Sequence, residues 1–334
     1  MKPDTVLSVK DMHTVFATPG GTAHAIRGVS FDLRRGERLG IVGESGAGKS
    51  ALVLSLLGLV EPPGRVAGGS VWLNGRDLRT LSERQMRRVR GKEISIVFQD
   101  PLTALNPVRR IGPQVAEVLL MHGDLSRKQA RERAVGLLAD VELPEPEKCY
   151  AAYPHELSGG MRQRVMIAIA LANSPDVLIA DEPTTALDAT TQAQIITLLN
   201  KVIEERGTAV VMITHNMGLV ADFCDTVQVM YAGEVVEYGS RDRLLDRPAH
   251  PYTAALLASV PAMDARRDLP LPALSGLPPS LTDLPEGCAF APRCPLEGER
   301  GLCRTTRPAP RILDGEPDRM SMCHFSAEQL ALTS

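Results

Sequence analysis

The chain has 334 residues, enough for about two domains, and 44% of them are hydrophobic, so it can fill a large buried core. Its formal net charge of −3 gives no general attraction to nucleic acid. The longest strongly apolar stretch, residues 51–60, is too short for a membrane span, and the first residues lack the apolar region of a signal peptide. We therefore expect any membrane association to come through partner proteins.

A glycine-rich loop is the first informative motif. Residues 43–50 (GESGAGKS) fit the phosphate-binding pattern GxxxxGK followed by Ser or Thr, between a predicted buried strand at 38–42 and a predicted buried helix at 51–57. The glycines let N–H groups point at phosphate oxygens, and Lys49 supplies a cation for the β- and γ-phosphates. Ser50 offers a hydroxyl to Mg²⁺. The expected nucleotide-binding residues of the loop are Gly43, Ser45, Gly46, Gly48, Lys49 and Ser50.

The following 120 or so residues change from strand to helix signals. Up to about residue 100 short strands alternate with the loop and its helix, and residues 73–76 (LNGR) carry a hairpin signal. From about 101 to 174 the pattern is mostly helical, and Ser126 is a predicted cap for a helix over 127–140. This order predicts an α/β core into which a helical subdomain is inserted.

A second helix start with exposed N–H groups is predicted at residues 157–164 (LSGGMRQR). Ser158 suits the N-cap, and Gly159 and Gly160 leave the N–H groups of the first turn bare. Such an end can bind an anion, although plain capping of a buried helix is the simpler interpretation of this segment alone.

An acidic pair follows the next predicted strand. The apolar run at 176–180 places Asp181 and Glu182 at its end, where open parallel sheets bind ligands. Asp181 would hold Mg²⁺ directly or through water, and Glu182 could take a proton from an attacking water. An amphipathic helix over 191–206, which ends at Gly207, and a strand over 208–214 are predicted next.

Together these motifs resemble those of ABC-type ATPases. Ser158, Gly159 and Gly160 match the signature motif, which in that family closes over ATP held by the glycine loop of a partner subunit. The resemblance implies an α/β P-loop core over 1–260, with a helical subdomain at about 101–174 and an antiparallel β subdomain. It also implies that a single copy is an incomplete enzyme.

Four further residues match family elements. Gln99 resembles the Q-loop glutamine, which senses the γ-phosphate and Mg²⁺, and Asp188 resembles the D-loop aspartate at the dimer interface. His215 resembles the switch histidine that contacts the γ-phosphate. Phe16 is placed like the aromatic residue that stacks on adenine, but it could equally be part of a strand core. The implied catalytic residues are Glu182, His215 and Gln99, and the implied Mg²⁺ ligands are Ser50, Gln99 and Asp181.

Two segments are similar to the ATPase subunits of oligopeptide and dipeptide importers: residues 98–107 (FQDPLTALNP) in the Q-loop region and 250–257 (HPYTAALL) beyond it. Met161 in the signature also occurs in the D-type subunit of these importers. The resemblance implies a transport ATPase, or translocase, that powers peptide import from the cytoplasmic face of the membrane, where it is peripheral. Its implied partners are a paralogous ATPase, two permeases and an extracytoplasmic peptide-binding protein.

Other functions stay open at this point. Nickel or sugars could be the cargo, because selectivity lies in the binding protein and the permeases. A soluble ABC ATPase that acts on nucleic acid or ribosomes would show tandem cassettes, a coiled coil or a basic patch, and the sequence shows none of these. A scaffold with a dead nucleotide site conflicts with the presence of Lys49, Asp181, Glu182 and His215.

The predicted C-terminal extension, residues 261–334, is rich in proline and glycine and contains four cysteines: Cys288, Cys294, Cys303 and Cys323. A proline follows Cys294, as it often follows a cluster ligand in ferredoxins. Residues 287–295 also resemble a C-terminal motif of the peptide-importer family, in which a 4Fe–4S cluster is known. We therefore expect the four cysteines to ligate one 4Fe–4S cluster with a structural role; Zn²⁺ and free thiols are the alternatives.

Overall fold

A computed structural model describes residues 4–123, 125–185, 187–259, 274–297 and 301–333. The chain divides into two compact units. The first contains the N-terminal residues up to Leu7 together with Leu33–Glu37 and Leu73–Met212; the second contains Ser8–Asp32, Arg38–Trp72 and the chain from Ile213 onward. The domain boundary predicted near residue 260 lies outside the described residues.

Parallel strands form the sheet part of the first unit. Strand β6 (Ile94–Val97) pairs in parallel with β7 (Val177–Asp181), with Ile94 opposite Val177 and Val97 opposite Ala180. Strand β8 (Ala209–Thr214), most of which belongs to this unit, is the neighbour of β7. These strands are rich in buried Val and Ile, as expected for parallel strands covered on both faces. Their pairing brings the chain segments after β6 and after β7 to the same edge.

Short elements connect the strands of the first unit. The predicted turn at 73–76 is present, with φ values of 49° at Asn74 and 78° at Gly75, and it leads into β5 (Arg76–Asp77). A 3₁₀ turn (Leu78–Thr80) and α2 (Glu83–Val89) follow. Ser82 and Gln85 form a capping box at the start of α2, which satisfies two N–H groups of its first turn.

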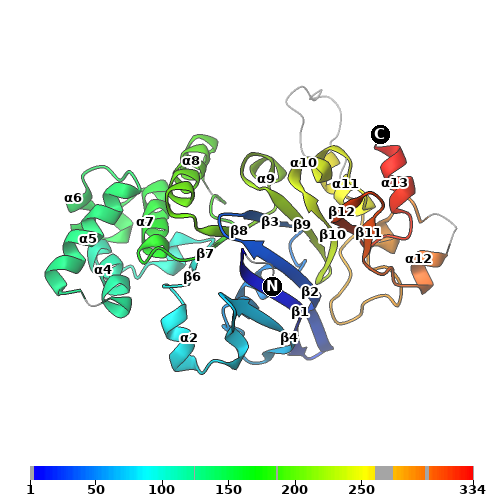
Figure 1. The fold of residues 1–334 in the computed structure, drawn as a ribbon, viewed down its shortest axis with the longest axis horizontal. Coiled ribbons are helices and arrows are strands. Elements are labelled where there is room, and N and C mark those ends of the chain that lie inside the picture. The colour runs from blue at the N-terminus through cyan, green and yellow to red at the C-terminus, as the bar shows by residue number, and fades with distance from the viewer. Residues whose placement is uncertain (1–3, 124, 186, 260–273, 298–300, 334) are drawn as a thin grey trace. The chain divides into compact units, whose positions relative to one another are not determined.

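Helices make up the rest of the first unit, and Figure 1 shows α4, α5 and α6 grouped beside α7. Buried residues recur three and four positions apart in α4 and α5, so each helix presents one apolar face to its neighbours. The bounds are α3 (Pro101–Ala104), α4 (Ile111–His122), α5 (Arg127–Asp140), α6 (Pro146–Ala151), a 3₁₀ turn (Pro154–Glu156), α7 (Gly159–Leu171) and α8 (Ala189–Arg206).

Two sheets form the framework of the second unit. In one, most of β1 (Thr5–Thr18) lies between β2 (Gly21–Arg34) and β4 (Gly64–Leu73). In the other, the order is β11-β12-β10-β9-β3, in which β3 pairs in parallel with β9 and the other pairs are antiparallel. Its bounds are β3 (Arg38–Val42), β9 (Thr226–Tyr231), β10 (Glu234–Ser240), β11 (Arg311–Leu313) and β12 (Glu316–Ser321). The C-terminal segment therefore supplies two strands.

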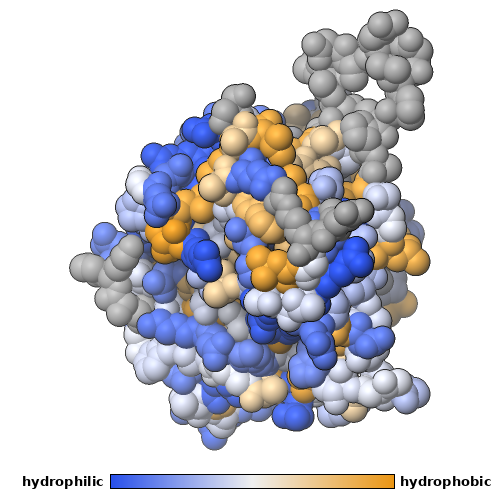
Figure 2. Space-filling view, turned by 90° about the vertical axis from the view of Figure 1, so that its right-hand side faces the viewer, coloured by the Kyte–Doolittle hydropathy of each residue, from blue (hydrophilic) through white to orange (hydrophobic). Residues whose placement is uncertain are grey.

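The helices of the second unit are short. They are α1 (Lys49–Leu56), α9 (Met217–Phe223), α10 (Arg241–Asp246), α11 (Pro251–Ala258), a 3₁₀ turn (Ala291–Arg293), α12 (Leu302–Thr305) and α13 (Ser326–Leu332). Figure 2 shows the face with the C-terminal elements, where apolar and hydrophilic side chains are interspersed. Over the part of the chain that the structure describes, no helix has the length and apolar character needed to cross a membrane.

Candidate functional site

The glycine loop joins β3 to α1 and folds around the Lys49 side chain. Lys49 Nζ donates to the carbonyl oxygens of Gly43 at 2.7 Å and Glu44 at 3.0 Å. Gly48, with φ 105°, is the N-cap of α1 and offers no capping side chain, so the first N–H groups of the helix can bind an anion. A Cβ atom at Gly48 would lie 2.4 Å from the carbonyl oxygen of Ala25, which excludes any larger residue. This geometry suits a phosphate group.

The acidic pair lies at the end of β7. Glu182 has φ 46°, a left-handed conformation that is uncommon for a residue other than glycine and is found at functional sites. Its Oε2 accepts hydrogen bonds from Gln99 Nε2 and from Thr185 Oγ1, each at 2.9 Å. Gln99 reaches Glu182 because β6 and β7 are parallel neighbours and both residues lie just beyond the strand ends. Sequence reasoning named Gln99 and Glu182 but missed Thr185.

The predicted signature helix and D-loop meet at Thr191. Ser158 caps α7 by accepting a hydrogen bond from the Met161 N–H at 3.3 Å. Asp188 caps α8, where its carboxylate accepts from the Thr191 N–H at 2.9 Å and from Thr191 Oγ1 at 2.7 Å; these bonds hold its pKa below the usual range. A Cβ atom at Gly160 would lie 2.7 Å from Thr191 Cγ2, so the two helix starts are in close contact.

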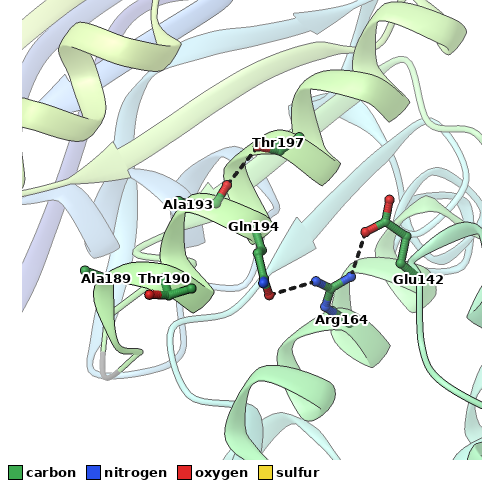
Figure 3. A pocket seen from close by; sticks show the side chains of 7 residues that line it. All are labelled: Glu142, Arg164, Ala189, Thr190, Ala193, Gln194 and Thr197. Carbon is green, nitrogen blue, oxygen red and sulfur yellow. Dashed lines mark hydrogen bonds and ion pairs between the residues drawn. The ribbon is translucent and has the colours of Figure 1, made fainter.

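A cavity of about 630 Å³ opens beside these helix starts (Figure 3). Arg164, on α7, connects two sides of the cavity. Its Nη2 donates to Gln194 Oε1 of α8 at 3.3 Å, and its Nη1 donates to Glu142 Oε2 at 3.2 Å. The lining residues are Glu142, Arg164, Ala189, Thr190, Ala193, Gln194 and Thr197. No sequence motif pointed to this cavity, because its residues come from three separate segments.

Two other predicted residues belong to the second unit, like the glycine loop. His215 is exposed directly after β8, where Asn216 caps α9. Phe16 is half-buried in β1, and its ring lies so close to Gly64 that a Cβ atom there would be 2.4 Å from the ring. Phe16 thus packs against Gly64 within the sheet. Gln99, Asp181, Glu182, Asp188 and the signature residues Ser158, Gly159 and Gly160 belong to the first unit.

The prediction of a metal centre in the C-terminal segment is wrong. Cys288 and Cys294 are half-buried, and Cys303 and Cys323 are buried. Within the described ranges, no group of three or more His, Cys, Asp or Glu side chains is placed to hold a metal ion. Burial raises the pKa of Cys288 to about 11 and that of Cys323 to about 12, so both thiols are neutral near pH 7. Over its described residues, the segment therefore shows no site for the expected 4Fe–4S cluster or for Zn²⁺.

Strand pairing and ion pairs order the C-terminal segment instead. β12 pairs with β10, and Arg319 in β12 donates to the buried Glu237 of β10 at 3.0 Å. Arg304 forms a two-pronged pair with Glu297, at 2.9 and 3.1 Å. Sequence reasoning assigned the ordering of this segment to a cluster because the cysteines were its most evident feature.

Comparison with known proteins agrees with the geometry. The sequence profile of the ABC transporter family matches residues 26–185, and that of the oligopeptide/dipeptide transporter C-terminal region matches residues 236–303. The dimeric post-hydrolysis structure of the ATP-binding cassette MJ0796, bound to ADP and Pi, is 30% identical with a TM-score of 0.64, and the match covers 70% of this chain and 98% of that chain. Phosphate loop, acidic pair and signature helix on this α/β fold define an ABC-type ATPase.

Relatives that match over most of their length show to which family of ABC-type ATPases the chain belongs. The oligopeptide transport ATP-binding protein OppD of Escherichia coli (strain K12) is 48% identical, over 98% of this chain and 95% of that protein. The dipeptide transport ATP-binding protein DppD of Bacillus subtilis (strain 168) is 48% identical, over 87% of each chain. The chain belongs to the oligopeptide/dipeptide transporter family of ABC ATP-binding proteins.

Proposed function

We propose that this protein is the ATP-hydrolysing subunit that powers import of oligopeptides or dipeptides across the cytoplasmic membrane through partner permeases. The observation that carries the proposal is the fixed carboxylate of Glu182, held by Gln99 and Thr185 at the end of a parallel strand. A carboxylate held in one orientation by two donors can take the proton of an attacking water. The full-length similarity to peptide transport ATP-binding proteins supports the choice of cargo.

Each residue of the site has a role in this proposal. The loop N–H groups of Gly43, Ser45, Gly46 and Gly48, with Lys49, bind the phosphates of ATP, and Phe16 stacks on the adenine. Ser50, Gln99 and Asp181 hold Mg²⁺, which supplies positive charge that stabilises the developing negative charge. Glu182 takes the proton of the attacking water, and His215 contacts the γ-phosphate.

The proposal includes a second ATPase subunit, paralogous to this one. Ser158, Gly159, Gly160 and Asp188 act on ATP bound to the loop of that subunit, so that each composite site needs two chains. Support comes from the exposed Ser158 at the start of α7 and from the dimeric state named for the cassette MJ0796.

The permeases are proposed to dock on the helices of the first unit. A groove of about 510 Å³ runs along α4, and the exposed fractions of Leu120 and Met121 beside it are 40% and 65%. Val108, just before α4, is 81% exposed. Large apolar side chains left in solvent mark an interaction site, and a short helix of a permease fits a groove of this kind.

In this proposal residues 1–260 form the nucleotide-binding domain with its helical subdomain at about 101–174, and residues 261–334 form the family's C-terminal extension. The protein is peripheral, on the cytoplasmic face of the membrane, and an extracytoplasmic binding protein delivers the peptide. The match of the transporter C-terminal profile to residues 236–303 supports a C-terminal part typical of this family, and it begins before residue 261.

The test uses the assembled transporter in lipid vesicles. Glu182→Gln keeps the size and the hydrogen bonds of the side chain but removes its basic oxygen, so ATP turnover and peptide uptake should both fall by about 10²- to 10⁴-fold while ATP affinity is retained. Glu132→Gln, the same change on the exposed face of α5, is the matched control. Turnover at the parent rate in the Glu182→Gln transporter would contradict the proposed role.

A further inference from the structure

The C-terminal segment reaches the phosphate loop through a single arginine. Arg293 Nη1 donates to Glu44 Oε2 at 2.7 Å, and Nη2 donates to Glu44 Oε1 at 3.0 Å. Glu44 is the second residue of the glycine loop, and the two partners lie in the same unit. The Arg293 side chain is 3% exposed, so this two-pronged pair is shielded from solvent on the arginine side. Such pairs are among the stronger ones in proteins.

Arg293 is itself held in place by the groups around it. Its Nε donates to the carbonyl oxygen of Ser275 at 2.9 Å, and Nη1 also donates to the Tyr231 hydroxyl at 3.3 Å. The guanidinium lies 5.8 Å from the ring centroid of Tyr231 and 5.9 Å from that of Phe290. The bonds to Glu44 raise the pKa of Arg293 above its ordinary value, so it stays charged. The guanidinium is thus oriented in advance for the carboxylate of Glu44.

Glu44 links this arginine to the centre of the loop. The Glu44 N–H donates to the Tyr252 hydroxyl at 2.9 Å, and its carbonyl oxygen accepts from Lys49 Nζ at 3.0 Å. Tyr252 packs against Phe290, with ring centroids 5.3 Å apart, so it also belongs to the surroundings of Arg293. The side chain, N–H and carbonyl of one loop residue are therefore all fixed, and the carboxylate is directed to Arg293.

We propose that Arg293 is a positioning residue of the nucleotide site: it neutralises Glu44 and turns its carboxylate away from the phosphates, so that the loop can accept a triphosphate. An unpaired carboxylate in this loop would repel the phosphates, because like charges a few ångströms apart are only partly screened inside a protein. The inference rests on the proposed function, because it concerns ATP binding at the same loop.

The first test is the affinity of the full chain for ATP, measured by titration calorimetry in the presence of Mg²⁺. Arg293→Gln should weaken ATP binding by about 10-fold, because it leaves the Glu44 charge unpaired. In the assembled transporter the KM for ATP should rise by a similar factor while kcat at saturating ATP changes little. Arg311→Gln, the same change at an exposed position of β11, is the matched control and should leave both constants at the parent values.

A second variant separates neutralisation of charge from support of the fold. Glu44→Gln alone removes the repelling charge and should bind ATP about as tightly as the parent. The double variant Glu44→Gln/Arg293→Gln should then recover most of the affinity that Arg293→Gln loses. A merely structural arginine predicts the opposite, a double variant at least as weak as Arg293→Gln, and that result would overturn the inference.

The outcomes also separate this inference from the proposed function. A parent chain that binds no ATP would contradict the proposed function, whereas a parent that binds ATP as tightly as Arg293→Gln does would contradict only the role of Arg293. Thermal unfolding shows whether each variant is folded. If Arg293→Gln does not fold, Arg293→Lys tests the inference instead. Lysine keeps the positive charge but cannot form the two parallel hydrogen bonds of the guanidinium. This variant should bind ATP less than 10-fold more weakly than the parent, and a larger loss would overturn the role of charge.

Discussion

Glu182 shows how the fold fixes the orientation of a single side chain. Its positive φ turns the chain sharply after β7, and the following Pro183 restricts the turn further. As a result the carboxylate lies where Gln99 and Thr185 both donate to one oxygen. A strained backbone of this kind persists only when the surroundings hold it, so the two donors and the buried strand act together.

The first prediction concerns Thr185. Thr185→Val removes the hydroxyl that donates to Glu182 but keeps the shape of the side chain, and a hydrogen bond to a charged group contributes about 1.5–3 kcal/mol. We expect kcat for ATP to fall by about 10-fold with KM nearly unchanged, because the carboxylate is less well oriented. Steady-state ATPase assays of the assembled transporter test this. Thr190→Val on α8 is the control, and an equal loss in both variants would contradict the specific role of Thr185.

The residues of the site differ in how visible they are from sequence. Lys49, Asp181 and Glu182 stand in short motifs next to apolar runs, so local pattern locates them. Thr185 and Arg293 act through side-chain contacts that only the fold creates, so sequence alone did not indicate these contacts. Cysteine spacing misled in the opposite direction, because spacing along the chain does not report whether the folded thiols are arranged to hold a metal ion.

At the scale of elements, α11 begins at an unusual cap. His250 is buried, and its Nδ1 accepts the N–H of Tyr252 at 3.0 Å. Burial lowers the pKa of His250 to about 3, so the imidazole is neutral in the folded protein, whereas an ordinary histidine has a pKa of 6.5. The unfolded chain therefore binds an extra proton between about pH 6.5 and 3. The contribution of the neutral, buried His250 to the free energy of unfolding is therefore fully present above pH 6.5. It decreases as the pH falls through this window.

The second prediction follows from this histidine. His250→Asn keeps an acceptor at the cap but cannot be protonated, so the variant should lose less stability than the parent between pH 7.5 and pH 5. The midpoint of thermal unfolding at the two pH values measures the difference. Glutamine at the exposed His155 provides the control, and its pH dependence should equal that of the parent. An unchanged slope in His250→Asn would exclude a buried neutral His250.

The third prediction concerns the junction of β10 and β12. Burial raises the pKa of Glu237, whose carboxylate accepts from the N–H groups of Ala249 and His250 and from Arg319. Arg319→Met removes the only cation among these partners and should destabilise the second unit by about 3–5 kcal/mol, as is found when one partner of a buried ion pair is removed. Denaturant unfolding measures this loss.

The double variant Glu237→Gln/Arg319→Met serves as the comparison. It removes both charges, so most of the stability lost in Arg319→Met should return. If the double variant were less stable than Arg319→Met, the loss would come from packing of the arginine rather than from an unpaired buried charge.

Predictions of elements succeeded where local signals were strong. Ser126 and Gly207 mark the observed start of α5 and end of α8, because a capping side chain and a left-handed glycine are properties of the local chain. The strands β11 and β12 escaped prediction. β11 has only three residues, β12 is mostly polar and contains Pro317, and β10, the partner of β12, lies about 80 residues earlier in the chain. Such pairing is decided by tertiary contacts rather than by propensity.

For the molecule as a whole, the predicted class of α/β ABC ATPase is confirmed by the cassette structures and by the full-length relatives. This class could be predicted from sequence because the glycine loop, the signature and the acidic pair occur in the same order along the chain as in the ABC family. The arrangement of subunits could not be predicted in this way, since it depends on contacts between surfaces that form only in the assembly.

The fourth prediction tests this arrangement. A Lys49→Ala chain cannot bind ATP properly, and a Gly160→Asp chain carries a charge and a bulk that the contact with Thr191 excludes. In an obligate heterodimer with a paralogue, mixing the two variants should not restore ATPase activity. Restoration would show that two copies of this chain form a composite site. Activity of an isolated monomer at high dilution would contradict shared sites in either form.

Glu44 and Arg293 are separated by 249 residues in the chain, and this separation has a consequence in time. A ribosome that adds about 5–20 residues per second needs roughly 12–50 s to extend the chain from the first partner to the second. During that interval the nascent chain has its glycine loop but not the arginine that pairs with it. A chain cut short by early termination or proteolysis remains in that state. The Glu44–Arg293 pair therefore forms only in chains whose translation has reached the C-terminal segment.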